Sequence, residues 1–114
     1  MKIYNITKNV FLAQDALLAD KFWQRMFGLL GKPALAQGSG IVLKPCNSIH
    51  TFFMRFSIDV IFIDRTNRVV KTVLELKPFR VTAVYLKACC AVELPAGSIK
   101  TSRTSSGDML RLDK

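Results

Sequence analysis

Three side chains near the middle of the chain have the chemistry of a thiol-enzyme site. Cys46 precedes His50, the only histidine, by four residues, and Asp59 follows His50 by nine. A thiol nucleophile, an imidazole base and a carboxylate that orients the base are the parts of such a site. Spacing alone does not assemble them, because catalytic groups meet in the fold rather than along the sequence. A hydrolase or transferase that uses Cys46, His50 and Asp59 is therefore one hypothesis, although no thiol-enzyme motif surrounds Cys46.

The same residues include metal-ligating types. Cys46 and His50, joined by one or both of the other thiols, Cys89 and Cys90, would make a three- or four-ligand zinc site. The sequence has no Cys-x-x-Cys pair and no second histidine, so we expect no metal and no other cofactor. The odd number of cysteines argues against a disulfide framework. Cys89 and Cys90 would point to opposite faces of a strand, which places them poorly for pairing with each other.

Asp59 lies near the start of the most apolar strand-like segment of the sequence. A buried, unpaired carboxylate is costly, so we expect Asp59 to have a partner. Its candidate partners are His50, Arg25, Arg55 and the backbone amides of a neighbouring loop. Asp59 then either holds a loop in place or belongs to a ligand pocket together with His50, Thr51 and Arg25.

The chain is strongly basic. It has 17 Lys and Arg against 8 Asp and Glu, for a formal net charge of +9, which favours anionic partners. No nucleic-acid-binding motif accompanies the densest basic stretch, so that stretch is either a solvated face or a surface for polyanions. The stretch contains Arg65, Arg68, Lys71, Lys77 and Arg80.

No apolar segment of the chain resembles a signal peptide or reaches the roughly 18 residues that span a membrane. We therefore expect a cytoplasmic protein with no membrane span.

Periodicity predicts a single domain over residues 1–114 that is mostly β. The expected class is α+β, with a compact, barrel-like antiparallel sheet of about eight short strands and one or two short helices. One helix is expected to start at Asp20, and residues 14–19 fit either a helix or a strand. Residues 64–68 predict a hairpin turn with Asn67 in the left-handed conformation, and residues 101–106 predict a polar loop. Strands are expected at 2–6, 10–13, 41–44, 49–54, 58–63, 69–76, 81–86, 88–94 and 109–112.

Four separated blocks of the sequence resemble a widespread prokaryotic family, domain of unknown function 192. The blocks are 25–30, 45–64, 92–97 and 107–108, and the resemblance extends over residues 16–112. It implies a small, mostly β fold with a short helix that carries Arg25, and it implies no reaction. Asn67 departs from the family pattern, which usually has Gly at this position of the hairpin.

Three functions remain open at this point. The first is a binding or accessory module, not an enzyme, that recognises a small polar ligand or a partner protein through a pocket near His50, Thr51, Asp59 and Arg25. The second is a binder of nucleic acid or another polyanion through the basic surface. The third is the Cys46, His50 and Asp59 enzyme, which would require Cys46 to react with thiol reagents much faster than the other two cysteines.

Overall fold

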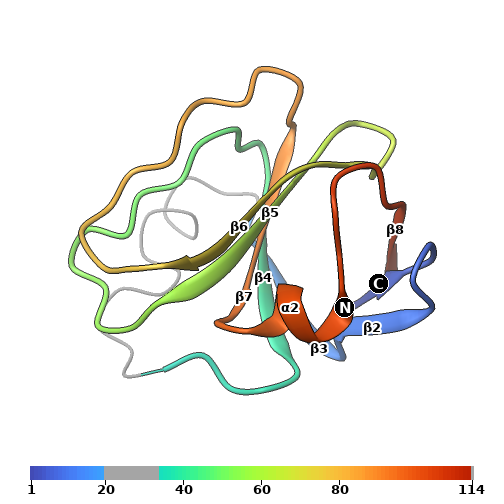
Figure 1. Ribbon diagram of the computed structural model, residues 1–114, viewed down its shortest axis with the longest axis horizontal. Helices are drawn as coiled ribbons and strands as arrows, with labels where there is room; N and C mark the ends of the chain where they lie inside the picture. The colour runs from blue at the N-terminus through green and yellow to red at the C-terminus, as the bar shows by residue number, and fades with distance from the viewer. Residues whose placement is uncertain (20–33, 114) are drawn as a thin grey trace.

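The computed structural model of the chain describes residues 1–19 and 34–113, which fold into eight strands and one short helix (Figure 1). No helix among these residues is long and apolar enough to cross a membrane. The elements are β1 (Lys2–Asn5), β2 (Val10–Ala13), β3 (Asp15–Ala19), β4 (Ser39–Leu43), β5 (Ile58–Ile63), β6 (Val69–Leu76), β7 (Cys90–Pro95), α2 (Ser98–Ser102) and β8 (Leu110–Asp113).

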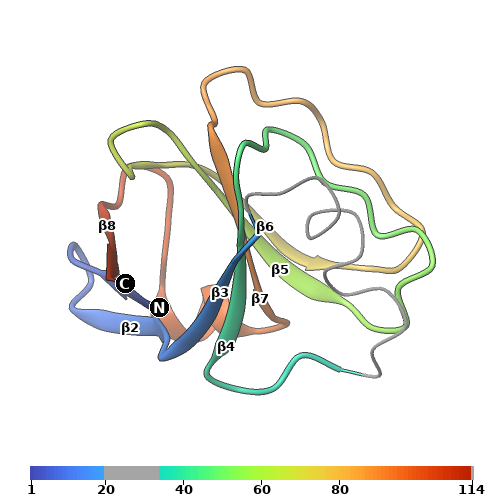
Figure 2. The ribbon, with the colours of Figure 1, turned by 180° about the vertical axis from the view of Figure 1, so that it is seen from behind.

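The strands form two sheets. The smaller sheet has the order β2-β1-β8 and carries both ends of the chain, which lie close together in Figures 1 and 2. The larger sheet has the order β3-β4-β7-β5-β6, so β7, which comes late in the sequence, is its central strand. All neighbours are antiparallel except β3 and β4, which are parallel. The mostly β prediction is confirmed, but the two sheets do not close into a barrel.

Two predicted strands are wrong. Residues 49–54 and 81–86 are loops that pair only at the isolated bridge between His50 and Val81. Their alternating apolar residues mimic a strand, but side-chain hydroxyls take over part of the hydrogen bonding. The Thr82 hydroxyl, for example, accepts a hydrogen bond from the Ile49 amide at 2.9 Å, which a second strand would otherwise satisfy.

Other local predictions have clear outcomes. Residues 15–19 form a strand, and the predicted loop over 101–106 is wrong at its first two residues, which belong to α2. Asn67 has a φ of 66° in the hairpin between β5 and β6, as predicted, and the Asp64 carboxylate caps this turn by accepting hydrogen bonds from the amides of Thr66 and Arg68. The helix expected from Asp20 lies outside the described residues.

The larger sheet separates two apolar clusters. The first cluster fills the space between the two sheets and α2, with Ile3, Leu110 and Ile99 as examples from β1, β8 and α2. The second cluster covers the opposite face, where the loops before β5 and β7 add Ile49, Met54 and Tyr85. Both faces of β5 and β7 are therefore buried, and a polar side chain on either strand needs a reason to be there.

A buried polar network joins the smaller sheet to the segment between α2 and β8. The Asn5 side-chain amide donates hydrogen bonds to Thr104 Oγ1 and Asp108 Oδ2, both at 3.0 Å. Asp108 Oδ2 also accepts hydrogen bonds from Lys8 Nζ at 2.8 Å and from the Ser105 amide at 3.0 Å. Burial by itself would raise the pKa of Asp108, but these hydrogen bonds lower it overall. The Gly107–Asp108 block thus holds the C-terminal part of the fold in place.

Candidate functional site

His50 is exposed on the loop before β5. Its ring stacks on Phe52 with the centroids 5.3 Å apart, and its Nδ1 accepts a long hydrogen bond of 3.4 Å from the Phe52 amide. Within the described chain no hydrogen bond or ion pair joins His50 to Cys46 or Asp59. The structure therefore does not link the three groups as a nucleophile, a base and its orienter.

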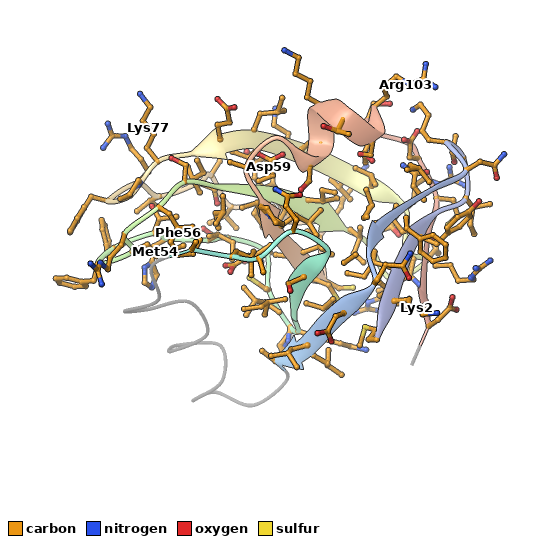
Figure 3. All side chains as sticks on the ribbon, turned by 90° about the horizontal axis from the view of Figure 1, so that it is seen from below. Lys2, Met54, Phe56, Asp59, Lys77 and Arg103 are labelled. Carbon is orange, nitrogen blue, oxygen red and sulfur yellow. The ribbon has the colours of Figure 1, made fainter. Side chains whose placement is uncertain are left out.

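Asp59 is fully buried on β5 and uses both carboxyl oxygens. Oδ1 accepts a hydrogen bond of 2.9 Å from the Glu75 amide of β6, and Oδ2 accepts one of 2.7 Å from the Ile99 amide of α2. Figure 3 shows Asp59 on the side of the sheet that carries α2. Of the candidate partners, backbone amides are those observed, so Asp59 on β5 joins α2 to β5 and to the neighbouring strand β6. Arg25 lies outside the described residues.

None of the three cysteines forms a disulfide with another. Cys46 Sγ donates to the Ser48 carbonyl oxygen at 3.1 Å, and the Sγ atoms of Cys89 and Cys90 lie 3.4 Å apart. The expectation that Cys89 and Cys90 point apart is wrong, because β7 begins at Cys90 and Cys89 still belongs to the preceding loop. Burial, followed by the Cys89 neighbour, raises the pKa of Cys90 to about 12. In residues 1–19 and 34–113 no three Cys, His, Asp or Glu side chains gather as a metal site.

Thr51 is buried and holds two loops together. Its hydroxyl donates a hydrogen bond of 2.6 Å to the Lys77 carbonyl and accepts one of 3.0 Å from the Arg80 amide. Its backbone adds hydrogen bonds to Arg80 and Phe79. Thr51 therefore connects residues 50–54 to residues 77–81 through both its side chain and its backbone.

These loops build a surface that we call the basic–apolar lobe, defined as residues 44–57 and 77–89. The lobe contains no Asp or Glu, whereas the rest of the chain contains all 8. Its loops form the outer rim on one side of the molecule in Figure 1, and Figure 3 labels Met54, Phe56 and Lys77 at this end. Five exposed basic residues lie on it, namely Lys44, Arg55, Lys77, Arg80 and Lys87.

Large apolar side chains also project from the lobe. Phe53 and Phe79 are 74% and 55% exposed, and their rings meet edge to face with centroids 5.7 Å apart. Leu86 is 87% exposed, and Val81 and Val84 are exposed as well. A surface that combines apolar side chains of this size with a single sign of charge is typical of an interaction site.

Sequence reasoning missed two features of the molecule. The first is the exposure of Phe53 and Phe79, since Phe53 lies in a segment that was predicted to be a strand and Phe79 was given no role. The second is Glu93, a buried carboxyl at the middle of β7. Desolvation by burial raises the pKa of Glu93 to about 7. The sequence contains a sign of this burial, because Glu93 lies between Val92 and Leu94 in an apolar segment. Asp59 lies between apolar residues of β5 in the same way.

Comparison with known proteins now places the fold. The model of the family DUF192, described as "Uncharacterized ACR", matches residues 4–112. The chain belongs to the DUF192 family. The resemblance seen in the four sequence blocks is thereby confirmed.

Relatives of this DUF192 chain include two UPF0127 proteins from Pyrococcus species. The protein from Pyrococcus horikoshii is 36% identical over 112 residues, which cover 96% of each chain. The protein from Pyrococcus abyssi is 36% identical over 112 residues, covering 93% of this chain and 92% of the relative. Neither description names a reaction or a ligand.

A solved structure has the same fold. A protein of unknown function from Novosphingobium aromaticivorans is similar with a TM-score of 0.83, covering 97% of this chain and 82% of that one. Its sequence is 14% identical, so the likeness shows the fold alone. The function of this DUF192 chain has to be argued from its own surface.

Proposed function

We propose that this DUF192 chain is a binding module whose recognition surface is the basic–apolar lobe. The partner we propose is an extended, acidic polypeptide segment with apolar side chains. One observation carries the proposal. Phe53 and Phe79 both have positive φ values, of 65° and 59°, and both hold their rings in solvent. A left-handed conformation is unfavourable for a bulky residue, and such strain concentrates at functional sites.

Charge complementarity supports an acidic partner. Residues 44–57 and 77–89 contain no Asp or Glu, so an acidic segment lying on the lobe would meet basic side chains such as Lys77, Arg80 and Lys87 without repulsion from a carboxylate of the lobe. Complementary potentials of this kind increase the rate of association and exclude basic competitors. The lobe holds five of the 17 basic residues and none of the 8 acidic ones, so it contributes +5 of the net charge of +9.

The backbone of the lobe supports a polypeptide rather than a nucleic acid or a lipid. Within the described chain, the amides of Val81, Ala83 and Val84 donate no hydrogen bond to another protein group. An extended partner could pair with such an exposed edge, as in other cases of added strands.

The predicted site residues take different parts in this proposal. His50 and its stacked neighbour Phe52 contribute to the edge of the recognition surface, and Thr51 fixes the two loops that form it. Asp59 supports the fold from the opposite face of the sheet, where α2 lies. Arg25 stays a predicted ligand-binding residue.

A peptide titration tests the proposal. The probe is a synthetic peptide in which Glu alternates with Val and Phe. Its length of about eight residues is within the usual range of a β-strand. The comparison probes are the same peptide with Lys for Glu, a single-stranded oligonucleotide and vesicles with anionic lipid. We expect the acidic peptide to bind and the basic peptide not to bind.

Matched variants locate the binding. Phe53→Asn keeps a residue that tolerates positive φ, so it should preserve stability and weaken binding about tenfold, the loss expected when a buried aromatic anchor is removed. Leu17→Thr, which removes an exposed apolar side chain outside the lobe, should leave the affinity unchanged. The double variant Arg80→Gln/Lys87→Gln should bind more weakly than the control Arg65→Gln/Lys100→Gln. Binding of only the oligonucleotide or the vesicles, or equal losses in the control variants, would overturn the proposal.

A further inference from the structure

Glu93 occupies the centre of the larger sheet, on the face opposite Asp59. It pairs with Ile41 of β4 and with Val60 of β5. Continuing the register to the sheet edges adds Leu17 of β3 and Val73 of β6 to the same row. Glu93 is thus the one carboxyl in a row whose other four members are apolar.

The carboxyl of Glu93 has no partner in the described chain. Glu93 is 6% exposed, yet its side chain makes no hydrogen bond and no ion pair with the described residues. Asp59 is buried to a similar extent on the next strand, but both of its oxygens accept backbone hydrogen bonds. The same sheet therefore carries one satisfied carboxyl and one unsatisfied carboxyl, on opposite faces.

The carboxyl of Glu93 also keeps a path to the outside. No unpaired side-chain oxygen in the described residues is completely shut off from solvent. Because the Glu93 oxygens are unpaired, they must retain a small contact with solvent. The carboxyl of Glu93 is therefore not completely sealed inside the sheet.

From Glu93 toward the β3 edge of the sheet, the side chains of the row are apolar and become more exposed to solvent. Ile41 is buried next to Glu93, and Leu17, on the edge strand β3, is exposed. A ligand that placed a charged group on Glu93 could lay an apolar body along these two side chains. The apolar contact and the charge would then act together on one ligand.

We propose that Glu93 anchors a binding site for a small organic cation, a protonated amine or guanidinium on an apolar body, with Ile41 and Leu17 as its apolar wall. The cation would supply the hydrogen-bond donors that this buried carboxylate lacks. The raised pKa of Glu93, caused by desolvation, is consistent with a carboxyl that has no cation beside it in the protein itself. Residues of the basic–apolar lobe pack on the same face of the sheet, but this inference does not depend on the function proposed for the exposed surface of the lobe.

The test uses hexylammonium as the cation and hexanol as its uncharged counterpart. The chain contains two glutamates, Glu75 and Glu93, so labelling the glutamate Cδ with carbon-13 gives two NMR signals. The signal that is missing from the spectrum of Glu93→Gln belongs to Glu93. At pH 6.5 we expect hexylammonium, and not hexanol, to shift the Glu93 signal toward its ionised position.

Affinity provides the second measurement. Glu93→Gln should weaken hexylammonium binding at least about tenfold, which is the loss of one charge-assisted hydrogen bond. Glu75→Gln, the same change at an exposed position, should have no effect. Equal binding of hexanol, unchanged affinity in Glu93→Gln, or a Glu93 signal that hexylammonium does not move would overturn the inference. The signal of the unsubstituted protein decides the question even if Glu93→Gln does not fold.

Discussion

Replacing Glu93 with Gln should stabilise the protein at pH 8 and leave it nearly unchanged at pH 4.5. The pKa of this carboxyl rises from 4.5 to about 7 because burial desolvates its charged form. The folded state therefore keeps the proton between these two pH values, while the unfolded state has already lost it. Stability contributed by this group is complete below pH 4.5, falls as the pH rises, and stays low above pH 7.

The size of the effect follows from the two pKa values. They differ by about 2.5, and each pKa unit corresponds to about 1.4 kcal/mol, so the ionised carboxyl costs the folded state about 3 kcal/mol at pH 8. Glutamine has nearly the same shape and never ionises, so Glu93→Gln should recover about this amount. The row around Glu93 holds only apolar side chains, so no nearby charge on that row offsets the cost.

Urea unfolding followed by circular dichroism measures the effect at several values between pH 4.5 and pH 8. The difference between the variant and the unsubstituted protein isolates Glu93, because other groups cancel. Asp108 is one such group, with a lowered pKa whose contribution is lost only as the pH falls. Glu75→Gln is the control and should track the unsubstituted protein. If the free energy of unfolding of Glu93→Gln differs from that of the unsubstituted protein by the same amount at every pH, the burial argument is refuted.

Two further predictions concern residues that the sequence singled out. Asp59→Asn should lower the free energy of unfolding by about 2–4 kcal/mol, because an amide NH₂ would face one of the two backbone donors; a loss below about 1 kcal/mol in urea unfolding would contradict this role. Cys90, whose pKa burial raises to about 12, should be the last of the three thiols to react with a disulfide reagent at pH 7.5. Mass spectrometry of the labelled protein locates the reacted cysteines. Early labelling of Cys90 would contradict the prediction. Much faster labelling of Cys46 than of Cys89 would support the thiol-enzyme hypothesis.

Local features of the fold followed from the sequence. The apolar run at 58–63 predicted a strand covered on both faces, and the turn residues after it predicted a hairpin with Asn67 in the left-handed conformation. Both are dictated by neighbours within a few residues, through side-chain alternation and the steric limits on φ. The cost of a buried carboxylate also established that Asp59 needed a partner.

Only the tertiary structure decided which groups meet. The amides that satisfy Asp59 are 16 and 40 residues away in the chain, and no periodicity encodes such pairings. The position of β7 at the centre of the larger sheet is equally non-local, and it makes Glu93 a buried, unpaired carboxyl. The hydrogen bonds between Thr51 and residues 77–80 hold residues 49–54 as a loop, in which Phe53 is exposed. The pattern of apolar residues indicates which side chains of a segment can be buried. The order of the strands and the long-range hydrogen bonds determine which of them are buried in the folded protein.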